Sequence, residues 1–105
     1  MKTTYLIVDG MLSGTGIRDG DHGGYIETSA IGVSSVLTGR ISEWLERYEN
    51  AHFFQFENAV ENELLDKQGV EIARSLKAEF PDARVTYFSN AELREIFFDW
   101  MPPKR

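Results

Sequence analysis

Two short stretches of the chain are rich in strand-forming residues. The first covers Tyr5 to Val8 and is followed directly by Asp9 and Gly10, and the second covers Ala83 to Phe88. The first stretch is continuously apolar, which predicts a strand that is covered on both faces. The second is predicted to be a strand because it contains Val85, Thr86, Tyr87 and Phe88. Because helical patterns separate the two runs, we expect a crossover that places the two strands in parallel.

Two long stretches between these strands have the spacing of amphipathic helices. The first helix would be capped by Ser34 or Ser35, and its apolar stripe consists of Leu37, Ile41, Trp44, Leu45 and Tyr48. The second runs from about Asn58 to about Glu79, where Pro81 stops it. Its stripe consists of Leu65, Gly69, Ile72, Ala73, Leu76 and Phe80. Gly69 on that stripe predicts a close approach by a neighbouring element.

The C-terminal part of the chain predicts a third helix. Ser89 precedes Glu92 by three residues, which is the spacing of a capping box, and Pro102 would end the helix. Its apolar stripe consists of Leu93, Ile96, Phe97 and Trp100. Phe98 falls off this stripe, so it is either buried on a second side or exposed at an interface. Between the two long helices, Ala51 to Phe56 could be extended chain or a short strand.

Glycine is concentrated in one segment. Six of the nine glycines lie between Gly10 and Gly24, a density that favours neither a helix nor a regular strand. The whole pattern predicts an α/β fold in a single domain over residues 1–105. We expect a sheet of two or three strands, at least two of them parallel, packed by about three helices, with a long glycine-rich loop after the first strand.

Composition narrows the functional classes. The 105 residues are 42% hydrophobic and include no cysteine, which excludes disulfides, thiolate metal ligands and thiol nucleophiles. The net charge of −6 disfavours nucleic acid and favours a basic protein partner. The Tyr5 to Val8 run is too short for a signal peptide or a membrane span, so we expect a cytoplasmic protein with no membrane partner.

The end of the glycine-rich segment matches a calcium-binding loop only in part. Asp19, Asp21 and Gly24 occupy the first, third and sixth positions of such a loop. Gly23 replaces an oxygen ligand, however, and Ala30 stands where the bidentate glutamate belongs. The two histidines are thirty residues apart and form no zinc-ligand pair. We therefore expect neither a metal nor another cofactor.

The same segment offers weak signals for other chemistry. Gly14, Gly16 and Gly20 have a loose dinucleotide-like spacing, but the later glycines prevent the helix that a pyrophosphate site requires. His22 lies near Asp9, Arg18, Asp19 and Asp21 in the sequence, and these residue types are the ones that acid–base chemistry needs. Polar surface loops, however, more often have no catalytic role. No nucleophile has a recognisable partner base, so an enzyme is not expected.

Several stretches give the chain a family resemblance. They are Ser13 to Asp19, Gly23 to Ile26, Leu65-Asp66 with Gly69, Ile72 and Ala73, and Tyr87 to Ser89. In these stretches the chain resembles small bacterial proteins, some of which look like immunity partners of polymorphic or contact-dependent toxins. The resemblance implies a protein that neutralises a toxin by contact, and it supplies no catalytic residues.

Charge and resemblance together predict a non-enzymatic immunity protein that captures a basic, nuclease-type toxin domain. The residues predicted to contact this partner are Arg18, Asp19, Asp21, His22, Tyr25, Glu27 and Phe98. The alternative is a small-molecule or nucleotide-binding module, enzymatic or not. Its site would lie in the glycine-rich loop, at the carboxyl end of the first strand.

Overall fold

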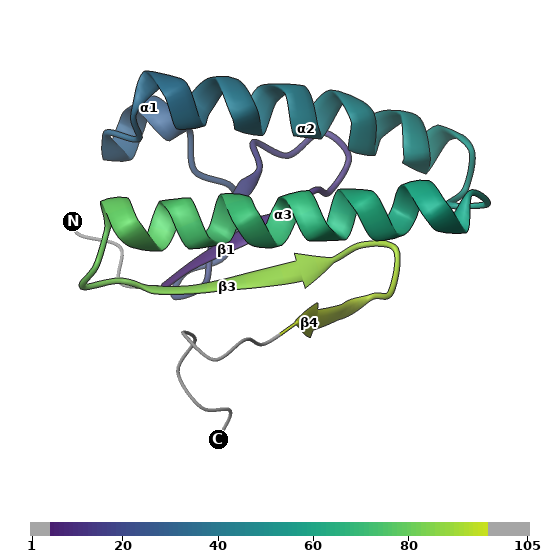
Figure 1. The fold of residues 1–105 in the computed structure, drawn as a ribbon. Coiled ribbons are helices and arrows are strands. Elements are labelled where there is room, and N and C mark those ends of the chain that lie inside the picture. Colours follow the sequence, from purple (N-terminus) through teal and green to yellow (C-terminus); the bar gives the residue numbers. More distant parts are fainter. Residues whose placement is uncertain (1–4, 97–105) are drawn as a thin grey trace.

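The structure, a computed structural model that describes residues 5–96, is an α/β fold with a four-stranded mixed sheet. In chain order the elements are β1 (Tyr5–Asp9), β2 (Ile17–Asp19), α1 (Thr28–Ile31), α2 (Ser35–Phe53), α3 (Ala59–Glu79), β3 (Arg84–Ser89) and β4 (Arg94–Ile96). The long helices α2 and α3 lie side by side over one face of the sheet (Figure 1). Within residues 5–96, no helix is long and apolar enough to cross a membrane.

The sheet has the order β2-β1-β3-β4, with the two predicted strands at its centre. Strands β1 and β3 are parallel, as the intervening helices predicted, and Leu6 pairs with Val85 while Val8 pairs with Tyr87. The outer strands run antiparallel to their neighbours, β2 to β1 and β4 to β3. The sheet therefore has more strands than the two or three expected, because each central strand gains a short antiparallel partner.

The core lies between the two long helices and the sheet. The first helix begins after the predicted cap Ser34, and the second matches its predicted bounds, with Asn58 as its cap. Their stripes face the core, although Leu45 and Phe80 are only partly buried. Trp44 and Ile72 are each 2% exposed, so the helical spacing predicted their burial correctly. Gly69 is needed where it stands, because a Cβ atom there would collide with the ring of Tyr87 on β3. The predicted close approach is confirmed.

The glycine-rich segment contains a strand, so the prediction that no regular strand forms there was wrong. Ile17 is completely buried and pairs with Val8, and this contact outweighs the low strand propensity around it. The glycines lie on either side of the strand. Gly16 adopts a φ of 96° beside Ile41, and Gly20 lies against the ring of Tyr5, where no side chain would fit.

The predicted third helix is also wrong over the residues that the structure describes. The amide of Glu92 does donate to the Ser89 hydroxyl at 3.0 Å, as a capping residue requires. The hydrogen bond closes a hairpin turn instead, because Leu93 takes a φ of 57° and the chain returns as β4. Phe97, Phe98 and Trp100, which belong to the same prediction, lie outside the described residues.

The segment Ala51 to Phe56 is neither extended chain nor a strand. Its first half is the last turn of α2, which ends at Phe53. Its second half is a tight turn in which Gln55 and Phe56 both have a φ of 57°. The short helix α1 was not predicted, and it ends at Gly32 in the left-handed conformation.

Candidate functional site

The carboxyl ends of β1 and β3 meet at one edge of the sheet, and polar side chains gather there. Asp9 ends β1 and is only 2% exposed, while Asn90 follows β3 and is 4% exposed. The Asn90 amide donates to Oδ1 of Asp9 at 2.7 Å, and the backbone amide of Met11 donates to the same oxygen at 3.0 Å. Asp9 thus ties the start of the following loop to both central strands.

The other oxygen of Asp9 holds two residues of the segment around β2. The Nε atom of Arg18 lies 2.9 Å from Oδ2 of Asp9, in an ion pair without a hydrogen bond at that nitrogen. The Tyr25 hydroxyl donates to Oδ2 at 3.4 Å, and Tyr25 is also bridged to Arg18 through the backbone. Burial, with the nearby charge of Asp9, raises the pKa of Tyr25, so its hydroxyl keeps the proton that it donates.

A second buried carboxylate, that of Asp66 on α3, lies near the same edge of the sheet as Asp9. Asp66 accepts hydrogen bonds from the hydroxyls of Tyr87 at 2.6 Å and Tyr48 at 3.1 Å through Oδ1, and from Ser89 at 2.8 Å through Oδ2. Burial is the main cause that raises the pKa of both tyrosines. The Tyr48 hydroxyl also accepts from the backbone amide of Asn90 at 3.1 Å. One network therefore extends from Asp66 to Asp9.

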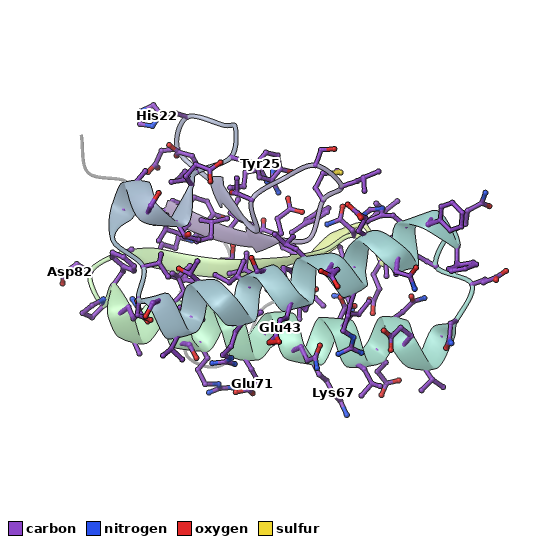
Figure 2. All side chains as sticks on the ribbon, turned by 90° about the horizontal axis from the view of Figure 1, so that it is seen from above. His22, Tyr25, Glu43, Lys67, Glu71 and Asp82 are labelled. Carbon is purple, nitrogen blue, oxygen red and sulfur yellow. The ribbon has the colours of Figure 1, made fainter. Side chains whose placement is uncertain are left out.

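The loop between β2 and Tyr25 is closed by its own hydrogen bonds. Oδ1 of Asp19 accepts from the backbone amides of Asp21 at 2.8 Å and His22 at 3.0 Å, and these bonds, the one from His22 first, lower the pKa of Asp19. His22 lies at the tip, with its ring 3.4 Å from Oδ2 of Asp19 (Figure 2). Gly23 and Gly24 supply the positive φ values that complete the turn.

The predicted contact residues fall into three groups. Asp21, His22, Tyr25 and Glu27 are exposed, and Glu27 precedes α1 without making a side-chain cap. Arg18 and Asp19 are half-buried and fix the loop from within through the bonds given above. Phe98 lies outside the described residues. Six of the seven residues therefore lie in one segment, from β2 to the start of α1, which we call the acidic loop (residues 18–27).

Asn90 and Asp66 were not predicted from the sequence, and Asp9 was named there only as a neighbour of His22, whose ring lies near Asp19 instead. Asp9 and Asn90 each follow a buried strand, which is a weak signal that they share a sheet edge. Asp66 stands next to Leu65 in the predicted helix, and its burial places a carboxylate where apolar residues are expected. Such a carboxylate on a buried helix face is the signal that could have identified it, because it requires polar partners.

The carboxylate of Asp19 in the acidic loop accepts hydrogen bonds from backbone amides. Both oxygens of Asp19 are already engaged, by two amides and by His22. Among residues 5–96, no three histidine, aspartate or glutamate side chains lie close enough together to hold a metal ion. No protein-family model, curated protein or solved structure matches the chain. Its function therefore has to be inferred from the geometry of the site.

Proposed function

We propose that this chain is a non-enzymatic binding protein that captures a basic protein partner by direct contact, as an immunity protein neutralises a nuclease-type toxin domain. The observation that carries the proposal is the anchoring of the acidic loop to the sheet. Asp9 holds the loop at Arg18 and at Tyr25, so the exposed Asp21 and Glu27 are presented from a fixed base.

A fixed loop favours binding because less conformational freedom is lost when the partner arrives. The loop is fixed by side chains, through Asp9, and by backbone bonds, such as that from the Asp19 amide to the Gly24 carbonyl at 2.9 Å. The net charge of −6 would also speed the approach of a basic partner and repel an acidic one. Both effects suit capture of a protein with a positively charged surface.

The polar groups behind the loop are engaged with one another. Asp9 has four partners, and Asp66 accepts from three hydroxyls, so neither carboxylate is left to act on a substrate. These groups form a network of the kind that fixes a loop in place. Such a network supports a binding role over a catalytic one.

A small-molecule site at the same edge is the second candidate. One observation favours it: the Arg18 side chain is 34% exposed at the carboxyl ends of two parallel strands, where α/β proteins often bind ligands. An anionic ligand would pair with its guanidinium. Thermal melting with inorganic phosphate or ATP tests this candidate, and a rise in melting temperature that Arg18→Gln abolishes would favour it.

The proposed capture is tested by co-expression with the protein encoded by the neighbouring gene. We expect the wild-type chain to bind this protein and to protect cells from it, and the association to slow as salt is added. Asp21→Lys with Glu27→Lys should weaken binding by about tenfold, mainly through slower association. Asp19 is left in place because its carboxylate holds the loop together.

The matched control reverses two exposed acids elsewhere on the surface. Glu43→Lys with Asp82→Lys gives the same change in net charge, on helix α2 and in the α3–β3 turn (Figure 2). We expect the control to retain most of the binding. Equal loss in both variants would mean that net charge alone acts, and no binding by the wild-type chain would contradict the proposed function.

A further inference from the structure

An exposed aromatic pair stands at the C-terminal end of α2. Phe53 is 77% exposed and Phe54 is 50% exposed, and their rings pack edge to face with centroids 5.1 Å apart. The pair lies at the end of α2 opposite to α1, beside the turn that leads into α3 (Figure 1). Adjacent aromatic rings that remain exposed on a folded protein are typical of a contact surface.

The turn after α2 keeps the pair outside. Phe56 packs on the rings of Tyr48 and His52, at 5.9 Å and 4.7 Å between centroids, and is half-buried. To place the Phe56 ring there, Gln55 and Phe56 both adopt a backbone φ of 57°, a value that residues other than glycine rarely take. The backbone strain thus turns one phenylalanine inward and leaves the preceding two in solvent.

Phe53 of the aromatic pair lines a hollow that also carries acidic side chains. The hollow has a volume of about 660 Å³, and its lining includes Leu12, Phe53, Glu46 and Glu49. Arg47, which also lines it, is neutralised by Glu61, whose carboxylate accepts two hydrogen bonds from it at 2.9 Å and 3.0 Å. Glu46 and Glu49 form no ion pair with any residue of the described part of the chain. These acidic side chains therefore keep their negative charge.

The segment Gly10–Gly14 connects the hollow with the acidic loop. His52 at the end of α2 lies with Nε2 3.1 Å from the Gly10 carbonyl, which holds the Gly10–Gly14 strip against the helix and brings Leu12 to the hollow. At the other end of the strip, Gly14 lies against the Tyr25 ring, so closely that a Cβ atom would not fit. Met11 and Leu12 in this segment are exposed apolar side chains, and they lie between Tyr25 and Phe53.

We propose that Phe53 and Phe54 are the apolar anchor of the surface that captures the basic partner. This inference rests on the proposed function and adds the part of the surface that dominates affinity. The partner it fits is a protein whose apolar pocket is flanked by lysine or arginine side chains, since the phenylalanines need a pocket and Glu46 and Glu49 need cations. The acidic loop then steers the encounter, and the aromatic pair keeps the complex together.

The test compares two equally exposed residues at opposite ends of the same helix. Phe53→Ala should weaken binding to the neighbouring gene product by about 30-fold or more, mainly through faster dissociation. Val36→Ala, at a position that is 75% exposed, should change binding by less than about twofold. Equal melting temperatures would show that both variants fold. Undiminished binding by Phe53→Ala would overturn the anchor and leave the proposed function standing.

A second measurement tests the surface without that partner. Short random peptides displayed on phage would be selected on the immobilised wild-type chain and then counter-selected against Phe53→Ala with Phe54→Ala. Enriched peptides that combine basic with aromatic or aliphatic residues support the inference. Peptides without basic residues, or no enrichment, overturn it. So does a wild-type dimer in sedimentation that Phe53→Ala dissociates, since the pair would then bind a second copy of the chain.

Discussion

The carboxylates of the interior and those of the acidic loop differ in their exposure and in their hydrogen-bond partners. Asp9 and Asp66 are 2% and 8% exposed; hydroxyl and amide groups donate hydrogen bonds to them, and the Arg18 guanidinium forms an ion pair with Asp9. In the loop, Asp21 and Glu27 are exposed, and Asp19 accepts hydrogen bonds from the backbone amides of its own turn. The buried carboxylates determine where the chain goes, because each requires partners from distant segments. The loop carboxylates determine what charge the finished fold presents.

This contrast predicts that the largest effect on stability comes from Asp66. Asp66→Ala removes the acceptor shared by Tyr48, Tyr87 and Ser89 and leaves a small cavity, so we expect the free energy of unfolding to fall by about 3 kcal/mol. Asp66→Asn keeps a carbonyl acceptor and should lose less. Urea unfolding followed by circular dichroism measures both.

The matched control for Asp66 is an exposed acid on the same helix. Glu63 lies one turn earlier, and its side chain is 75% exposed in a long ion pair with Lys67. Glu63→Ala should change the free energy of unfolding by less than about 0.5 kcal/mol. If Asp66→Ala were as stable as this control, the buried network would have no organising role.

Alkaline pH is expected to have the next largest effect, through the tyrosines around Asp66. Burial raises the pKa of Tyr87 well above its ordinary value of 10.0, so above that pH the unfolded chain loses a proton that the folded chain keeps. Stability is therefore fully present below about pH 10. Through Tyr87, the free energy of unfolding should fall by about 1.4 kcal/mol for each pH unit above about pH 10.

Urea unfolding in buffers between about pH 9 and about pH 11 checks this slope, with tyrosinate absorbance as the second readout. Tyr87→Phe removes the ionising group, so its stability should fall less steeply over the same range. A slope that is the same in the variant and the wild-type chain would mean that Tyr87 ionises inside the fold.

The elements that could be predicted are those with a local cause. The helical spacing of Trp44 and Ile72 depends on neighbours within a turn or two, and both residues are buried as predicted. The Ser89 and Glu92 pattern is local as well, and its hydrogen bond forms, but distant contacts decide whether the next residues form a helix or a strand. Ser89 is held in β3 by Asp66, and the chain turns back to pair with that strand.

The candidate site also has parts that the sequence predicted and parts that it did not. Charged and aromatic residues among glycines indicated an exposed loop, and Tyr25 and Asp21 are exposed there. Its anchor could not be predicted, because Asp9 meets Asn90 across 81 positions of the chain. The aromatic pair was missed for a related reason. The sequence Phe53 to Phe56 does not reveal which ring turns inward, since the positive φ at Phe56 depends on packing against Tyr48.

The smallest effect on stability should come from Asp19, the one acid that closes the loop. Asp19→Asn keeps an acceptor for the Asp21 and His22 amides but removes the charge that faces the His22 ring. The turn should open more often while the fold stays intact. Hydrogen exchange of those two amides should therefore speed up, and the unfolding midpoint in urea should not move. Asp21→Asn, which leaves the Asp19 carboxylate in place, is the matched control.

Acid pH sharpens the same test, because the bonds from backbone amides lower the pKa of Asp19 below its ordinary value of 3.8. A lowered pKa means that the folded chain favours the carboxylate, so its contribution is present above about pH 3.8 and is lost as the pH falls through the folded value. Exchange in the wild-type turn should then approach that of Asp19→Asn as the solution is acidified, while Asp21→Asn follows the wild-type chain. A wild-type turn that exchanged like Asp19→Asn already at neutral pH would show that the carboxylate does not close the loop. The acidic loop would then be held by its backbone bonds and by Asp9, and the capture surface would have to draw its rigidity from these bonds and from the contacts of Asp9 with Arg18 and Tyr25.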